Sequence, residues 1–117
     1  MRSSLEEGLK HLCELWKEKG DMVLNRRLES VLNKEFLLKS EEESFAIEFG
    51  KGTFELKKGE SSRFHAVIQM PRTDWEKVLK GEYSVQSVVI GGRCPYFKHQ
   101  RQFIMQFSMV VQTLLLL

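Results

Sequence analysis

The first third of the chain carries apolar residues at helical intervals. The residues that share one face are Leu5, Leu9, Leu12, Leu15 and Trp16. Ser4 followed by Glu7 has the spacing of a capping box, and Gly20 offers a C-terminal stop. The pattern therefore predicts one amphipathic helix over about 5–19 and a second, capped by Asp21, that ends near Asn33.

From Phe36 the hydrophobic period changes to two, which is typical of strands. Apolar and polar residues alternate over 45–49 and 54–57, and Gly50-Lys51-Gly52 between them predicts a hairpin turn. The three glutamates at 41–43 fit a solvated hairpin tip. Residues 64–70 are apolar on both faces, so we expect a strand in the interior of the sheet. Together with 36–39 these segments predict a four-stranded meander.

The remainder of the chain reads as helices with one more strand. Thr73 and Glu76 repeat the capping-box spacing before a short helix that ends at Gly81. Ser84 can cap a helical turn through Val89, although the β-branched Val88-Val89-Ile90 is equally compatible with a strand. Residues 93–99 predict a fifth strand despite Pro95, and a final helix follows from Gln100. We therefore expect one domain over 1–117, with a helical part (1–34), a strand meander (35–70), and helices plus the last strand (71–117).

Composition and charge narrow the functional classes. The 117 residues are 42% hydrophobic and 29% charged with a formal net charge of +2, which is ordinary for one soluble globular domain and too weakly basic to predict nucleic-acid binding. The acidic residues in the first apolar segment exclude a signal peptide. With two cysteines, Cys13 and Cys94, the sequence predicts a cytoplasmic protein with free thiols. Polar residues interrupt the apolar stretch 103–117, which is also too short for a transmembrane helix.

The order of elements after the meander resembles the sterol carrier protein 2 domain family. The matching segments are Val67-Ile68-Gln69-Met70, Val78-Leu79-Lys80-Gly81-Glu82, 85–92, 93–99 and 103–117. The resemblance covers roughly residues 35–117, and its last strand lacks the second glycine of the family pattern. It implies an α+β domain with a five-stranded, mostly antiparallel sheet, helices on one face, and an apolar cavity between the sheet and the C-terminal helix for fatty-acyl, sterol-like or isoprenoid lipids.

The C-terminal helix carries more apolar surface than one packing contact needs. Its apolar residues form an arc of roughly 160° on a helical wheel, wider than the ~100° stripe of an ordinary surface helix. Three more, Met105, Met109 and Leu116, fall outside the arc. Two interpretations stay open: the helix is clamped between the sheet and another element, or its surplus surface lines a lipid cavity or covers a partner. Flexible methionine side chains suit a site that accepts varied ligands.

Residue types place the candidate cavity. Each apolar or aromatic residue of this set also suits an ordinary core. The residues that we expect to line the cavity are Phe54, Leu56, Ile68, Trp75, Leu79, Val89, Phe97, Phe103, Phe107, Met109 and Val110. The basic residues Arg93, Lys98 and Arg101 are candidates for contact with a lipid head group or an anionic membrane surface. We expect no metal and no catalytic group, because neither zinc-ligand spacing nor a nucleophile with its base is present.

These observations favour a non-enzymatic domain without a cofactor that binds or transfers an apolar ligand in the cytoplasm, with at most peripheral membrane contact. The alternative is an interaction module whose apolar C-terminal helix, ending in Leu114-Leu115-Leu116-Leu117, is covered by another chain or by a second copy in a homodimer. Solvent extraction followed by mass spectrometry of the purified protein, and its sedimentation, discriminate between the two hypotheses.

Overall fold

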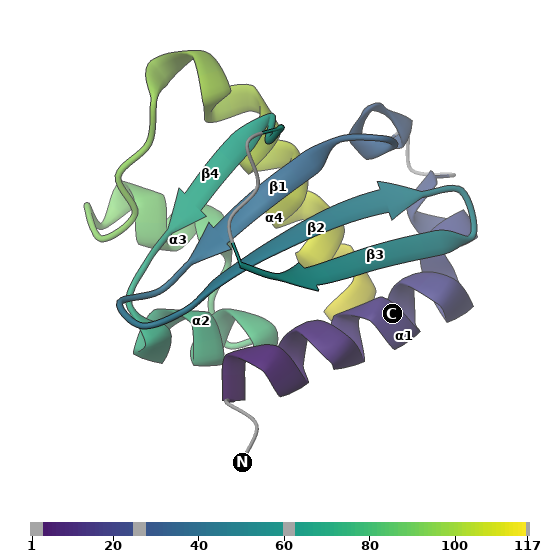
Figure 1. Cartoon of the computed structure of the whole chain (residues 1–117), viewed down its shortest axis with the longest axis horizontal. Coiled ribbons are helices and arrows are strands. Elements are labelled where there is room, and N and C mark those ends of the chain that lie inside the picture. The colour runs from purple at the N-terminus through teal and green to yellow at the C-terminus, as the bar shows by residue number, and fades with distance from the viewer. Residues whose placement is uncertain (1–3, 25–27, 60–62, 117) are drawn as a thin grey trace.

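The computed structural model describes residues 4–24, 28–59 and 63–116. Figure 1 shows a four-stranded sheet with α4 running behind it and α1 lying along the side of β3. The elements in chain order are α1 (Ser4–Leu24), the 3₁₀ turn η1 (Glu29–Val31), β1 (Glu35–Lys39), β2 (Ser44–Gly50), β3 (Thr53–Lys58), β4 (Ala66–Gln69), α2 (Arg72–Leu79), α3 (Val85–Ile90), the 3₁₀ turn η2 (Lys98–Gln100) and α4 (Arg101–Leu116).

The first helix is longer than its sequence pattern predicts. It passes through Gly20, which is buried, with the ring of Trp16 only 3.3 Å from the place where a Cβ would stand. Glycine costs a helix interior about 1 kcal/mol, and the burial of Val23 one turn later offsets part of that cost. The predicted second helix is wrong over 28–33, where a short 3₁₀ turn is followed by Asn33 at φ 62°. Residues 25–27 of that prediction lie outside the described residues.

The sheet has the order β3-β2-β1-β4 and is mixed. β1 pairs antiparallel with β2, which pairs antiparallel with β3, while β4 lies parallel to β1 with Phe36 opposite Ala66 and Leu38 opposite Ile68. These four side chains point to the helices and are fully buried. The predicted meander is wrong because strand periodicity decides which face is buried but not which strands are neighbours.

β4 is an edge strand rather than the interior strand that its two apolar faces predict. Val67 is the apolar residue on its outer face, and it is half-buried. The segment 95–97 lies beside it, since Val67, Pro95, Tyr96 and Phe97 line the same hollow. A chain segment that follows much later in the sequence thus covers part of this face. The strand is apolar on both faces as the pattern indicates, but the segment 95–97, and not a further strand, covers part of its outer face.

The fifth strand predicted over 93–99 is wrong. Residues 93–97 form no regular element, and the free edge of β4 is satisfied by side chains instead of a strand. The buried Gln100 side chain accepts the Val67 N–H through its Oε1 at 3.0 Å, and the Gln69 N–H donates to the sulfur of Cys94. Pro95 has no N–H to give to a ladder, which explains why this segment follows the edge without pairing. The sheet therefore has four strands and not five.

Two tryptophans tie helices to strand ends. The Trp16 Nε1–H donates to the carbonyl oxygen of Gly50 at the end of β2, and the Trp75 Nε1–H donates to that of Lys39 at the end of β1, each at 2.9 Å. Both rings are buried, so each indole N–H needs a partner inside the protein. These bonds fix α1 and α2 against the same face of the sheet.

The helices of the last third follow the sequence pattern closely. α2 is present, but Pro71 and not Thr73 is its N-cap, since the Pro71 carbonyl accepts from Asp74 N and Trp75 N. α3 is a helix and not a strand, and the Ser84 hydroxyl caps it by accepting the Ser87 N–H at 3.1 Å. The predicted final helix is confirmed as α4.

Candidate functional site

The space between the sheet and α4 is filled by aromatic side chains. The Phe107 ring, at the centre of α4, lies 5.3 Å from the ring of Phe36, 6.3 Å from that of Phe49 and 6.4 Å from that of Trp75, measured between centroids. All four side chains are fully buried. The region in which the family resemblance implies a lipid cavity is therefore closely packed in this structure.

The predicted lining residues are divided between this core and the surface. Those in the hydrophobic core are Phe54, Ile68, Trp75, Leu79, Phe107 and Val110, and those packed against it and partly buried are Leu56, Val89 and Phe103. Phe97 and Met109, by contrast, are 61% and 52% exposed. Phe97 borders the hollow of about 170 Å³ on the outer side of β4. The eleven residues are therefore divided among the core, its edge and the surface.

A cavity of about 280 Å³ lies instead on the flank of α4, between its C-terminal half and the turn that joins α2 to α3. Its lining is half apolar and half polar: Val78, Gly81, Glu82, Tyr83, Ser84, Val85, Ser87, Ser108, Val111, Gln112, Leu115 and Leu116. None of the eleven predicted residues is among them, although Leu79 and Val110 are direct chain neighbours of lining residues.

The turn between α2 and α3 has the conformation that the cavity wall needs. Gly81 adopts φ +82°, which favours glycine, and a Cβ built on it would lie 3.9 Å from that of Leu115. After this turn the Ser84 cap starts α3, and Ser108 on α4 holds the first turn of α3 by accepting the Gln86 N–H on its Oγ at 3.2 Å. Ser108 is buried, so this bond is shielded from water.

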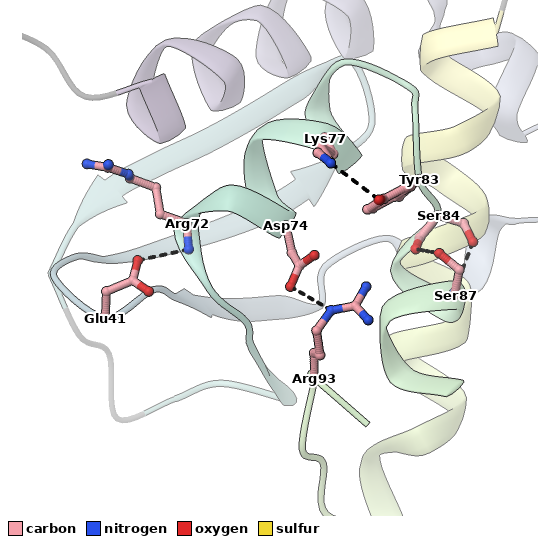
Figure 2. Close-up of polar contacts among 8 residues, drawn as sticks. All are labelled: Glu41, Arg72, Asp74, Lys77, Tyr83, Ser84, Ser87 and Arg93. Atoms are coloured by element: carbon pink, nitrogen blue, oxygen red, sulfur yellow. Dashed lines mark hydrogen bonds and ion pairs between the residues drawn. The ribbon is translucent and has the colours of Figure 1, made fainter. Parts of the chain in front are cut away.

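Tyr83 forms the outer rim of the cavity and is held from α2. The Lys77 ammonium donates to the Tyr83 hydroxyl at 3.3 Å and lies 5.0 Å from the centre of its ring. Figure 2 shows Lys77 on the side of Tyr83 that is away from α4, with Ser84 and Ser87 on the side near α4. A cation over an aromatic ring is attracted by its negative face. Lys77 therefore orients the rim without itself lining the cavity.

The three basic residues predicted to meet a head group lie away from this cavity. Arg93 donates through Nε to Oδ2 of Asp74 at 3.1 Å (Figure 2), and the Asp74 side chain is mostly buried, so this charge already has a partner. Lys98 and Arg101 are exposed in and just after η2. None of the three lines the 280 Å³ cavity.

The second cysteine is chemically quiet in this arrangement. Burial raises the pKa of the Cys94 thiol, and the charge of Asp74 adds to the increase, while the bond from the Gln69 N–H opposes it. Only the thiolate is a strong nucleophile, so this environment works against reactivity.

Across residues 4–24, 28–59 and 63–116, no three His, Cys, Asp or Glu side chains group as a metal site would require. In the same ranges no helix has the length and apolarity to cross a bilayer.

The sequence contains signals for the observed cavity that residue type alone does not reveal. Gly81 and Ser84 predict the turn and the cap that form one wall, and Val111 and Leu115 belong to the wide apolar arc of the last helix. The predicted lining set favours aromatic residues and methionine, because these dominate ligand pockets. Here most of the predicted aromatic residues lie in or against the core, and the described lining of the cavity is mainly valine, leucine and serine, with Tyr83 as its one aromatic residue.

The architecture matches solved structures of sterol carrier protein 2 type. A crystal structure of sterol carrier protein 2 superposes with a TM-score of 0.62 at 16% identity, covering 93% of this chain and 91% of that one. The conserved hypothetical protein TT1886 from Thermus thermophilus gives 0.57 at 14% identity, covering 97% and 90%. The UbiJ-SCP2 ubiquinone synthesis protein gives 0.59 at 9% identity, covering 74% and 72%. Neither family models nor curated proteins give a match.

At these identities the comparisons establish the fold. The chain is an α+β protein with the sterol carrier protein 2 fold, as the order of its elements predicted.

Proposed function

We propose that this protein binds an apolar small molecule, of the fatty-acyl, sterol-like or isoprenoid kind, without chemical conversion, in the cavity beside α4. The observation that carries the proposal is the cavity itself: about 280 Å³ with Val78, Val85, Val111 and Leu115 in its lining. Burial of apolar ligand surface contributes roughly 25 cal/mol per Å², so a lining of this kind gives affinity without a charged anchor.

The volume of the cavity limits the size of the ligand that it can hold without a change in the structure. Pockets for small molecules usually have about 300–1,000 Å³, so this space suits a short chain or one end of a longer one. Leu116, 71% exposed in the last turn of α4, lies in the lining and marks the side from which the remainder of a ligand would project. A sterol-sized ligand requires the C-terminal part of α4 to move outward, which is the opening mechanism that we propose.

The fold agrees with this proposal. Of the structures that share it, one is a sterol carrier protein and another takes part in ubiquinone synthesis, as their names state. Those functions belong to those proteins. They support the proposal for this chain because it has the same arrangement of sheet and helices.

The test combines extraction with a binding assay. Freshly purified protein is extracted with organic solvent and analysed by mass spectrometry, and N-phenyl-naphthylamine, an apolar fluorescent probe, is titrated into the delipidated protein. Leu115→Trp fills the cavity from α4, and we expect it to abolish probe binding. Met109→Trp adds the same ring to an exposed position of the same helix outside the lining, and we expect it to bind normally. Equal binding by both variants, or none by the wild type, overturns the proposal.

The second candidate is the interaction module, and one observation favours it. Met109 and Leu116, which lie outside the apolar arc of α4, are 52% and 71% exposed, whereas the described residues of the arc itself are mostly buried against the sheet and the other helices. Sedimentation of wild type and Met109→Ser tests it. A dimer that dissociates in the variant would support the module, and a monomer at all concentrations would contradict a homodimer.

A further inference from the structure

The lining of the cavity contains one charged side chain, and its charge is negative. Glu82 lies in the turn between α2 and α3 and is exposed to solvent. The described lining contains no lysine, arginine or histidine. A carboxylate or phosphate on a ligand would therefore enter a site that offers repulsion and no counter-charge.

The polar groups that remain are uncharged. Ser84 Oγ accepts the Ser87 N–H at 3.1 Å, and Ser108 Oγ accepts the Gln86 N–H at 3.2 Å. A hydroxyl that accepts a bond in this way keeps its own hydrogen for donation. The Ser87 hydroxyl is already donated to the Ser84 carbonyl at 2.7 Å. Ser84 and Ser108 thus present neutral donors to an acceptor oxygen on a ligand.

Two basic side chains of α2 and the segment after α3, Lys77 and Arg93, are engaged with other residues. Lys77 donates to the Tyr83 hydroxyl on the side away from α4, and Arg93 pairs with Asp74 (Figure 2). Neither lines the cavity. An anionic head group could bind Lys77 only if the hydrogen bond from Lys77 to the Tyr83 hydroxyl breaks. Lys77 is therefore the residue to replace if an anionic ligand binds more tightly than a neutral one.

We propose that the cavity selects lipids with an uncharged hydroxyl or carbonyl head over fatty acids and other anionic lipids. This inference rests on the proposed function, since it concerns the ligand of the same cavity. Two like charges about 6 Å apart repel enough to weaken binding by about threefold in water-like surroundings and by about a hundredfold at an effective dielectric constant near 20. Because Glu82 is exposed, we expect a discrimination toward the lower end of that range.

The experiment compares two ligands that differ in the head alone, decanol and decanoate, by displacement of N-phenyl-naphthylamine at neutral pH. We expect decanol to bind at least about threefold more tightly. Glu82→Gln removes the charge and keeps the shape, so it should strengthen decanoate binding by about threefold and leave decanol unchanged. The matched control is Glu55→Gln on the exposed outer side of β3, which should change neither.

Each outcome decides between the two proposals. Equal binding of both ligands, with no effect of Glu82→Gln, overturns the head-group selection and leaves the binding function standing. Tighter binding of decanoate that is lost in Lys77→Met also overturns it, by assigning the head group to Lys77. If neither ligand displaces the probe from the wild type, the proposed function itself fails.

Discussion

Replacement of Phe107 by alanine tests whether the space under α4 is core or ligand cavity. Phe107 stands in the middle of α4 with no exposed surface, and its ring lies 5.3–6.4 Å from the rings of Phe36, Phe49 and Trp75. Phe107→Ala removes one ring from this cluster and leaves a void that the sheet and two helices must close. The sequence pattern assigned this residue to a cavity wall, so the two interpretations predict different costs.

The magnitude follows from complete burial. A buried Phe→Ala replacement costs about 3–5 kcal/mol, and each aromatic pair that Phe107 forms with a neighbouring ring accounts for about 0.5–1.5 kcal/mol beyond the buried area. The total free energy of unfolding of a domain of this size is about 5–15 kcal/mol. At about 4 °C per kcal/mol, the midpoint of thermal unfolding should fall by about 12–20 °C.

Urea unfolding followed by tryptophan fluorescence measures the loss directly. Trp16 and Trp75 are both buried, so their emission changes when the core opens. The control is Met109→Ala, two residues further along the same helix and 52% exposed. We expect the control to stay within about 0.5 kcal/mol of the wild type.

One pattern of results would refute this reasoning. If Phe107→Ala costs less than about 1 kcal/mol and the folded variant no longer binds the apolar probe, Phe107 lines an open cavity. The packed interior would then be a closed form of the binding site, and the cavity on the flank of α4 would be secondary. A large loss of stability with probe binding intact at low temperature supports the assignment made above.

Three further predictions concern other parts of the molecule. Ser84→Ala removes the cap of α3 and should cost about 1 kcal/mol in urea unfolding; no loss would mean that the cap contributes nothing. Because the pKa of the Cys94 thiol is raised, this thiol stays protonated in the folded state at pH values at which it ionises in the unfolded state. The free energy of unfolding of the wild type should therefore fall between neutral pH and about pH 10, and more steeply than that of Cys94→Ala. Parallel pH profiles of the two proteins would contradict this. If the wild-type protein co-sediments with phosphatidylglycerol vesicles, Lys98→Glu with Arg101→Glu should reduce the bound fraction, since each basic residue near an anionic surface contributes about 1 kcal/mol; equal loss in a Lys51→Glu, Lys57→Glu control, which changes the net charge by the same amount at exposed positions in β3 and in the turn before it, would show that only net charge matters.

The local elements of this protein could be read from the sequence because short-range rules decide them. The Ser84 cap, the glycines at 50 and 52 and the period of 3.6 after residue 100 act within a few residues, and α3, the β2–β3 turn and α4 lie where those signals place them. The order of the elements was also sufficient to predict the sterol carrier protein 2 fold, which the superpositions confirm.

The errors occur where distant segments compete for one partner. The sequence pattern placed β4 in the interior of the sheet and read the aromatic segment 93–99 as a fifth strand. In the structure the Gln100 amide and the Cys94 sulfur accept N–H groups at the edge of β4, so no further strand is required. A side chain that replaces a strand leaves no periodic trace in the sequence.

The predicted lining residues and the observed cavity differ for a related reason. Aromatic residues are as suitable for a core as for a pocket, and only the packing decides which they form. Phe107 and Trp75 meet at the centre because helices from both ends of the fold converge there. Gly81 and Ser84 in the α2–α3 turn have little or no side chain to fill the flank of α4, and they form part of the lining of the cavity there.

The sequence by itself determined the first helix, the β2–β3 hairpin and the helices α2, α3 and α4, together with the wide apolar arc of the last helix, since each depends on neighbouring residues along the chain. The tertiary structure decided that β4 joins β1, that Arg93 is neutralised by Asp74, and that the cavity carries Glu82 and serines rather than phenylalanines. These features depend on contacts between residues far apart in the chain, whose free energies are settled only when all the elements pack together.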